Sequence, residues 1–499
     1  MQSYDGDIEV ICPTLSTAGE LLGDHVDKPK KKRKKNKKVP KAGVFDLSET
    51  ILESSDQSPV FAQHRISTEA VKKWKTQFLS DRTKRLAQKA CTHYSTLTLM
   101  SDNDPPLSHV FNTKISTEVR PVVDQQSTGT CWIYAGLNVL RTFYCKHNKL
   151  DEFKFSAAHL FFWDKVERCN YLLELFLKFA QEGAQPSDRN FLHVLTQPLS
   201  DGGSWQMLVN LVEKYGLLPD CVYSTPYLAK YSHTLKAILN NQLRVNCYKL
   251  MNLVKDGKSD TEISETKEEM MQKLFEIIST CLGFPLDSVE YDFYDKDKKY
   301  HKIGPISPQE YYETSVKPHF DMSQQVVIIN DPRPEHEYGK TYSVEYLGNM
   351  VGVETTKYLN LPIDKIEGYA KDSIKADIPV WFGCELKAMC SITGQLCPEQ
   401  FDFELMFDIS MRSMDKATRM TFGEARSSHA MVLNGLNELE NGDVDKWRVE
   451  NSWGVGTGAG KVIHVLYSKY QLAVIVKVLL PLKCWWKELY SLKRNTADY

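Results

Sequence analysis

The sequence lacks any long apolar run. No stretch of about 18 apolar residues, the length that a membrane-crossing helix requires, occurs in its 499 positions. The nearest candidate, 462–482, is interrupted by His464, Lys469 and Lys477, so we interpret it as core or edge segments. The amino-terminal segment MQSYDGDIEVICP carries acidic residues and has no basic flank followed by an apolar stretch, which argues against a secretory signal. We therefore expect no association with a membrane.

The sequence also lacks an excess of charge and any paired cysteine motif. Its formal net charge of −2 gives no reason to expect nucleic acid as the main partner. The twelve cysteines are dispersed, with no CxxC pair and no Cys/His set at zinc-finger spacing. Scattered thiols without an export signal fit a reducing compartment, so we predict free cysteines and a cytoplasmic location.

The length and the order of patterns predict an α+β protein with two unlike lobes. A chain of 499 residues exceeds what one hydrophobic core usually fills, and its 42% hydrophobic content is that of a globular protein. Helical spacing dominates the first part, whereas short β-branched runs follow Gly304. We predict helices over 67–88, 133–141, 156–169, 204–215 and 265–282, and strands over 326–329, 380–382 and 431–433.

A dense basic block runs from Lys28 to Lys41 within a segment that has few large apolar residues. Inside it, the stretch from Pro29 to Lys34 has the form of a nuclear-import signal. Nuclear import or weak nucleic-acid contact is one interpretation, and a solvated tail is the other. We predict that residues 1–62 form a basic, disordered extension.

A cysteine stands where a polar loop becomes a helix. The loop begins at Gln125 and reaches Cys131, which is followed by a strong helical pattern. Unsatisfied N–H groups and the helix dipole stabilise a thiolate in a first helical turn, and a thiolate is the nucleophile that acyl transfer needs. Alone, such a cysteine is more often a small buried residue.

Two later segments supply the partners that a nucleophilic cysteine requires. His429 lies between small residues before an apolar β run, and Asn451 ends a strand two positions before Trp453. A histidine can act as the base, and the asparagine can orient its ring while the indole excludes water. The side-chain amide of Gln125 and the Cys131 N–H can stabilise an oxyanion. Each signal is weak alone, but together they indicate a catalytic site.

This set of motifs resembles the papain family of cysteine peptidases. The separation between Cys131 and His429 is 298 positions, which leaves room for a large helical insertion. That spacing, together with four further stretches, resembles the bleomycin hydrolase branch of the family. The stretches are FFWDKVER (161–168), DGGSW (201–205), NDPRP (330–334) and WRVENSWG (447–454).

The resemblance implies a helical lobe and a β-barrel-like lobe within 63–454, with the mainly helical insertion at about 150–320 and the β-rich lobe at about 325–454. It implies a cytosolic aminopeptidase that assembles as a hollow homohexamer and needs neither metal nor organic cofactor. Peptide substrates are expected, together with hydrolysis of the bleomycin amide and of homocysteine thiolactone. Cys131 would attack the carbonyl, His429 would protonate the leaving amine, and Gln125 would hold the oxyanion.

The carboxyl-terminal segment 455–499 departs from the family pattern, which usually continues with a Gly-rich turn, a final strand and a terminal arm that restricts cleavage to free amino termini. Two alternatives therefore remain open. One is an endopeptidase with an open cleft. The other is a catalytically weakened family member that binds nucleic acid through Lys28–Lys41, in which case binding would be salt-sensitive.

Overall fold

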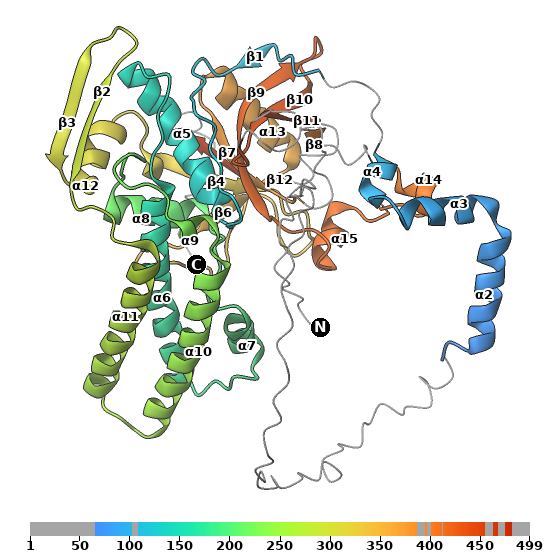
Figure 1. Cartoon of the computed structure of the whole chain (residues 1–499), viewed down its shortest axis with the longest axis horizontal. Helices are drawn as coiled ribbons and strands as arrows, with labels where there is room; N and C mark the ends of the chain where they lie inside the picture. The colour runs from blue at the N-terminus through green and yellow to red at the C-terminus, as the bar shows by residue number, and fades with distance from the viewer. Residues whose placement is uncertain are drawn as a thin grey trace, which may run out of the picture. The chain divides into compact units, whose positions relative to one another are not determined.

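The structure is a computed structural model (Figure 1) in which the chain divides into two compact units, Ile11–Leu99 and the remainder. The predicted basic extension, including Lys28–Lys41, lies outside the residues that the structure describes. The described residues are 65–101, 108–386, 395–396, 401–411, 413–454, 463–467 and 475–481.

The described part of the first unit is helical. The single helix predicted over 67–88 is instead two helices, α2 (Thr68–Ser80) and α3 (Arg82–Cys91), followed by α4 (Thr96–Met100). Ser67 caps α2, because its side chain accepts a hydrogen bond from Ala70 N. The break falls at Asp81, whose carboxylate accepts hydrogen bonds from Thr83 N and Lys84 N and so starts a second helix.

The helical lobe of the second unit is built around α5 and α6. Figure 1 shows the long helices α6, α10 and α11 running alongside one another. A two-stranded hairpin, β2–β3, interrupts the helices. The elements are α5 (Cys131–Asn148), α6 (Ala157–Gln181), α7 (Arg189–Thr196), α8 (Trp205–Tyr215), α9 (Tyr227–Lys230), α10 (His233–Lys255), α11 (Asp260–Leu282), β2 (Val289–Tyr294), β3 (Tyr300–Ile306), α12 (Pro308–Tyr311), η2 (Tyr312–Val316) and η3 (Met322–Gln324).

Local sequence explains where these helices begin. Ser156, Ser204 and Ser259 cap α6, α8 and α11, and the last forms a capping box with Glu262. Helix α6 continues well beyond the predicted end at 169, because apolar residues recur at helical spacing and are buried against α10 and α11.

The second lobe contains a ten-stranded sheet in the order β5-β6-β4-β12-β7-β9-β10-β11-β8, with β1 also paired to β9. All three predicted strands are present within it. Its elements are β1 (Thr113–Lys114), β4 (Gln325–Ile329), β5 (Thr341–Ser343), β6 (Lys357–Asn360), α13 (Ile363–Lys375), β7 (Val380–Cys384), β8 (Gln395–Leu396), α14 (Phe403–Phe407), α15 (Lys416–Thr421), β9 (His429–Glu438), β10 (Val444–Glu450), β11 (Ile463–Tyr467) and β12 (Ile475–Pro481).

The two faces of this sheet contribute side chains to two different hydrophobic cores. Trp381 and Val432, which are paired across β7 and β9, belong to the core of the helical lobe, and α5 packs on that face. Their neighbours Phe382 and Met431 point the other way, into a second core that α13 covers. The central strands therefore join the nucleophile helix to the β-rich lobe.

The described strands do not close into a barrel: the path ends at β5 on one side and β8 on the other. Strands β11 and β12 come from the segment 455–499, and β12 lies between β4 and β7. Within the described residues, no helix has both the length and the apolar character needed to cross a membrane.

Candidate active site

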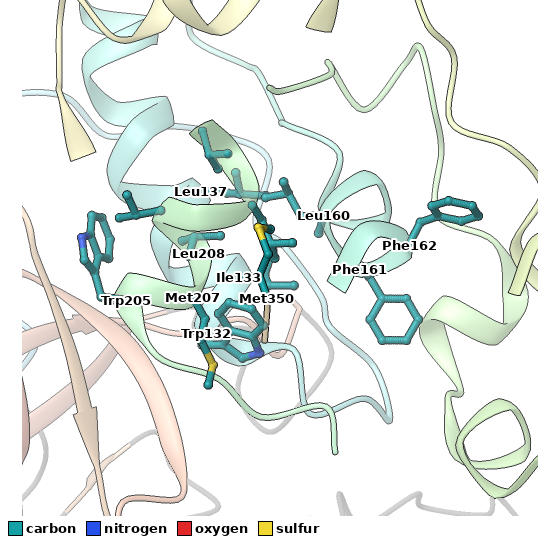
Figure 2. Close-up of a cluster of buried hydrophobic side chains, with 14 of the residues drawn as sticks. Trp132, Ile133, Leu137, Leu160, Phe161, Phe162, Trp205, Met207, Leu208 and Met350 are labelled. Atoms are coloured by element: carbon teal, nitrogen blue, oxygen red, sulfur yellow. The ribbon is translucent and has the colours of Figure 1, made fainter. Parts of the chain in front are cut away.

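Cys131 is the first residue of α5, as the loop-to-helix pattern predicts. The next residue, Trp132, fixes this end of the helix, because its indole Nε1 donates to Asp201 O at 2.7 Å. Its backbone oxygen accepts a bond from Trp381 Nε1 at 3.3 Å, which ties α5 to the sheet. Figure 2 shows Trp132 among the buried side chains of α5, α6 and α8. The sulfur is thus carried by a tightly packed helix end.

A buried ion cluster lies behind the nucleophile loop and unites two of the stretches that carry the family resemblance. The ammonium of Lys165 contacts carboxylates of Asp164 at 3.1 Å and Asp201 at 3.0 Å, and its side chain is fully buried. Arg168 binds Asp164 and donates to Gly202 O. Although burial opposes ionisation, the ammonium groups of Lys165 and Lys236 hold the pKa of Asp201 well below its usual range.

His429 is the first residue of β9, and its ring is oriented by Asn451. The distance from His429 Nε2 to Asn451 Oδ1 is 2.8 Å. The same oxygen accepts the backbone N–H of Ser452 at 2.8 Å, which fixes the orientation of the amide. Since Oδ1 can only accept, Nε2 carries the hydrogen and Nδ1 keeps a lone pair. Trp453 stacks on the imidazole with ring centroids 5.1 Å apart.

Gln125 is joined to the same segment. Ser452 Oγ donates to Gln125 Oε1 at 2.6 Å, and Gln125 N donates to Ser452 O at 2.8 Å. The amide Nε2 of Gln125 donates to Thr128 O at 2.6 Å. An amide nitrogen carries two hydrogens, so one remains for an oxyanion. Ser452 therefore connects the orienting asparagine to the candidate oxyanion donor, a connection that the sequence motif did not reveal.

The sulfur and the imidazole segment meet across the two lobes. The backbone N–H of Ala430, the residue after His429, points at Cys131 Sγ with an N···S distance of 3.4 Å. The four predicted residues are all buried, with Cys131 7% exposed, His429 6%, Gln125 6% and Asn451 2%. The structure therefore brings together residues from three segments separated by up to 326 positions of sequence, from Gln125 to Asn451.

Burial has the largest effect on the pKa values of Cys131 and His429, and it opposes the thiolate that the position at the helix start predicts. Desolvation raises the pKa of the Cys131 thiol to about 11, although three nearby backbone N–H groups act in the opposite direction. It also lowers the pKa of His429 to about 4, against the effect of Asn451. The helix terminus thus acts as predicted, but burial outweighs it. Both shifts favour the uncharged forms of the thiol and the imidazole.

This arrangement can transfer a proton without a change of net charge. His429 Nδ1 can take the thiol proton as sulfur attacks a carbonyl, which gives an imidazolium able to protonate a leaving group. Among the residues that the structure describes, no group of three or more His, Cys, Asp and Glu side chains could hold a metal ion.

Sequence comparison identifies the class of protein. The sequence profile of the Peptidase C1-like family matches residues 65–483. The chain belongs to this family of cysteine peptidases and is an enzyme of that type, as predicted. The match extends through β11 and β12, beyond the point at which the motifs stop at Gly454.

Particular relatives confirm the resemblance to bleomycin hydrolase. Bleomycin hydrolase of Homo sapiens is 43% identical over 374 residues, which cover 74% of this chain and 82% of the human protein. Aminopeptidase C of Streptococcus thermophilus is 34% identical, covering 74% and 82% of the two chains. The crystal structure of PepW from Lactobacillus rhamnosis HN001 superposes with a TM-score of 0.82 at 30% identity, covering 87% of this chain and 96% of PepW.

Proposed function

We propose that this chain is a cysteine aminopeptidase that removes amino-terminal residues from peptides through Cys131, His429, Asn451 and Gln125. The observation that carries the proposal is the contact set of the site: Asn451 orients the imidazole of His429, and Ala430 N meets the Cys131 sulfur. The relatives named bleomycin hydrolase and aminopeptidase C support the choice of substrate.

The mechanism begins from the neutral pair. As Cys131 Sγ attacks the scissile carbonyl, its proton passes to His429 Nδ1. The remaining amide hydrogen of Gln125 and the Cys131 N–H stabilise the oxyanion. The imidazolium then gives its proton to the leaving amine, and the acyl-enzyme forms. Neutral His429 next takes a proton from water, whose oxygen attacks the thioester, and the thiol is restored as the acid leaves.

The test compares an aminoacyl fluorogenic substrate that has a free amine with its acetyl-blocked counterpart. We expect hydrolysis of the free-amine substrate only, with a loss of several orders of magnitude in Cys131→Ala. Equal rates on the two substrates would identify an endopeptidase instead. Activity that survives in Cys131→Ala would reject the mechanism.

Three finer properties belong to the same proposal. We propose hydrolysis of the bleomycin amide and of homocysteine thiolactone, measured by product formation with purified wild type and Cys131→Ala. We propose a homohexamer, measured by sedimentation or light scattering; a monomer would contradict it. We propose a cytoplasmic location, measured by microscopy of the tagged full-length chain. A variant that lacks residues 29–34 is imaged beside it. A difference in nuclear signal between the two would indicate nuclear import, and equal signals would indicate a passive tail.

A further inference from the structure

The corner where α9 meets α10 contacts the nucleophile loop at Gln126 and the neighbouring residue Asp201. Tyr231 O–H donates to Gln126 Oε1 at 3.3 Å, and Gln126 directly follows the candidate oxyanion donor. The next residue, Ser232, donates its hydroxyl to Asp201 Oδ2 at 2.5 Å. Asp201 in turn accepts the Trp132 indole hydrogen. The helical insertion is therefore held directly against the loop that ends at the nucleophile.

Gln126 is fixed at this contact. Its backbone adopts a left-handed conformation with φ of 54°, which is uncommon for a residue other than glycine. Its backbone N–H donates to Asp124 Oδ1 at 2.8 Å, and its side-chain amide donates to the other oxygen of the same carboxylate. Asp124 is itself bridged to Trp453 in the segment after Asn451. The position of the Tyr231 hydroxyl is thus set relative to both halves of the site.

Two aromatic rings face solvent at this corner. Tyr231 is 39% exposed and Tyr227 is 72% exposed, and their ring centroids lie 4.9 Å apart. Exposed aromatic pairs provide a large apolar contact area at a low cost in side-chain entropy. The Tyr227 hydroxyl makes no hydrogen bond within the part of the chain that the structure describes, although its backbone oxygen accepts one from Tyr231 N. A polar partner in that part of the chain therefore does not explain the exposed ring.

We propose that Tyr227 and Tyr231 form a substrate subsite that accepts a bulky apolar or aromatic side chain near the scissile bond. This inference rests on the proposed peptidase function. Consecutive residues of an extended peptide advance about 3.3–3.6 Å each. Gln126 adjoins the oxyanion donor and accepts a hydrogen bond from Tyr231. The subsite is therefore assigned to a side chain one or two residues from the scissile carbonyl. The insertion thereby determines specificity as well as fold.

The experiment uses full-length protein and fluorogenic peptides with a free amino terminus. In one peptide pair, Phe or Ala stands directly before the scissile bond, and in a second pair it stands directly after that bond. In Tyr227→Ala and Tyr231→Ala, the ratio of kcat/KM for the Phe peptide to that for the Ala peptide falls about 2- to 10-fold at one position, mainly through KM. Tyr231→Phe keeps the ring and so keeps the ratio.

Tyr248→Ala is the matched control, because Tyr248 is a 68% exposed tyrosine on α10. It lies about 22 Å along the helix axis from the start of α10 at His233. The inference is overturned if both alanine variants leave the Phe/Ala ratio unchanged, including when they reduce activity on both peptides equally. It is also overturned if Tyr248→Ala changes the ratio as much. Failure of the proposed function appears separately, as activity that survives Cys131→Ala.

Discussion

The hydroxyl of Ser452 offers a direct way to perturb the site without touching the nucleophile or the base. It donates to Gln125 Oε1 at 2.6 Å, and both residues are buried. We predict that Ser452→Ala lowers kcat while KM changes little, because Gln125 then loses the bond that fixes its amide toward the oxyanion.

Ser452→Ala should change both the free energy of unfolding and kcat. The substitution leaves the buried acceptor Gln125 Oε1 without its hydrogen-bond donor. An unsatisfied buried acceptor lowers the free energy of unfolding by about 1–3 kcal/mol. For catalysis, complete removal of an oxyanion donor costs about 10²- to 10³-fold in kcat, so a donor that is present but loosened should cost about 10- to 100-fold. Ser452→Thr retains a hydroxyl and should recover most of the loss.

The assay is steady-state kinetics beside chemical unfolding of each variant. Ser279→Ala is the matched control, since Ser279 is also buried but its hydroxyl has no hydrogen-bond partner among the described residues. In a double-mutant cycle, Ser452→Ala should have little further effect once Gln125 is alanine. Full additivity of the two substitutions, or an unchanged kcat in Ser452→Ala, would refute the reasoning.

Three further outcomes follow from the same geometry. Asn451→Ala should lower kcat about 100-fold or more with KM nearly constant, since the imidazole loses its orienting acceptor; steady-state kinetics measures this, and a change confined to KM would contradict it. Burial lowers the pKa of His429 to about 4. The rate at which iodoacetamide alkylates Cys131 should therefore fall only near pH 4, and not near the ordinary pKa of imidazole. A fall in this rate near pH 6.5 would count against a buried neutral ring. Gly203→Ala should lower the free energy of unfolding by about 1–3 kcal/mol, because a Cβ at this position would lie 2.5 Å from the indole ring of Trp132. Gly202→Ala is the control and should be close to neutral, because a Cβ there has no neighbour within 4 Å. Equal losses in chemical unfolding would reject the steric explanation.

Local sequence predicted the helices and strands well where the pattern was strong. The start of α5 at Cys131 and the strands β4, β7 and β9 follow directly from loop residues and β-branched runs. The hairpin β2–β3 was missed inside a region interpreted as helical. Its strands expose alternate residues, a period of two that the helical interpretation overlooked.

The pairing of the site depends on tertiary structure that the sequence does not display. Motif order indicated that Cys131, His429 and Asn451 act together, but only the tertiary fold places the start of β9 against the first turn of α5. The burial that opposes charge on both groups is likewise a property of packing between the lobes. For the same reason, a helix-terminus argument alone predicted a thiolate where desolvation favours the thiol.

The central claim is that the sulfur of Cys131 and the imidazole of His429 act as one unit. Mass spectrometry of iodoacetamide-treated protein at pH 7 measures the alkylation rate of each cysteine, with the exposed Cys221 as an internal reference. We predict that Cys131 is alkylated about 100-fold faster in wild type than in His429→Ala, that the Cys221 rate is the same in both, and that peptidase activity disappears in step with Cys131 modification. Equal rates at Cys131 in the two proteins, or activity that persists after its complete alkylation, would contradict the account.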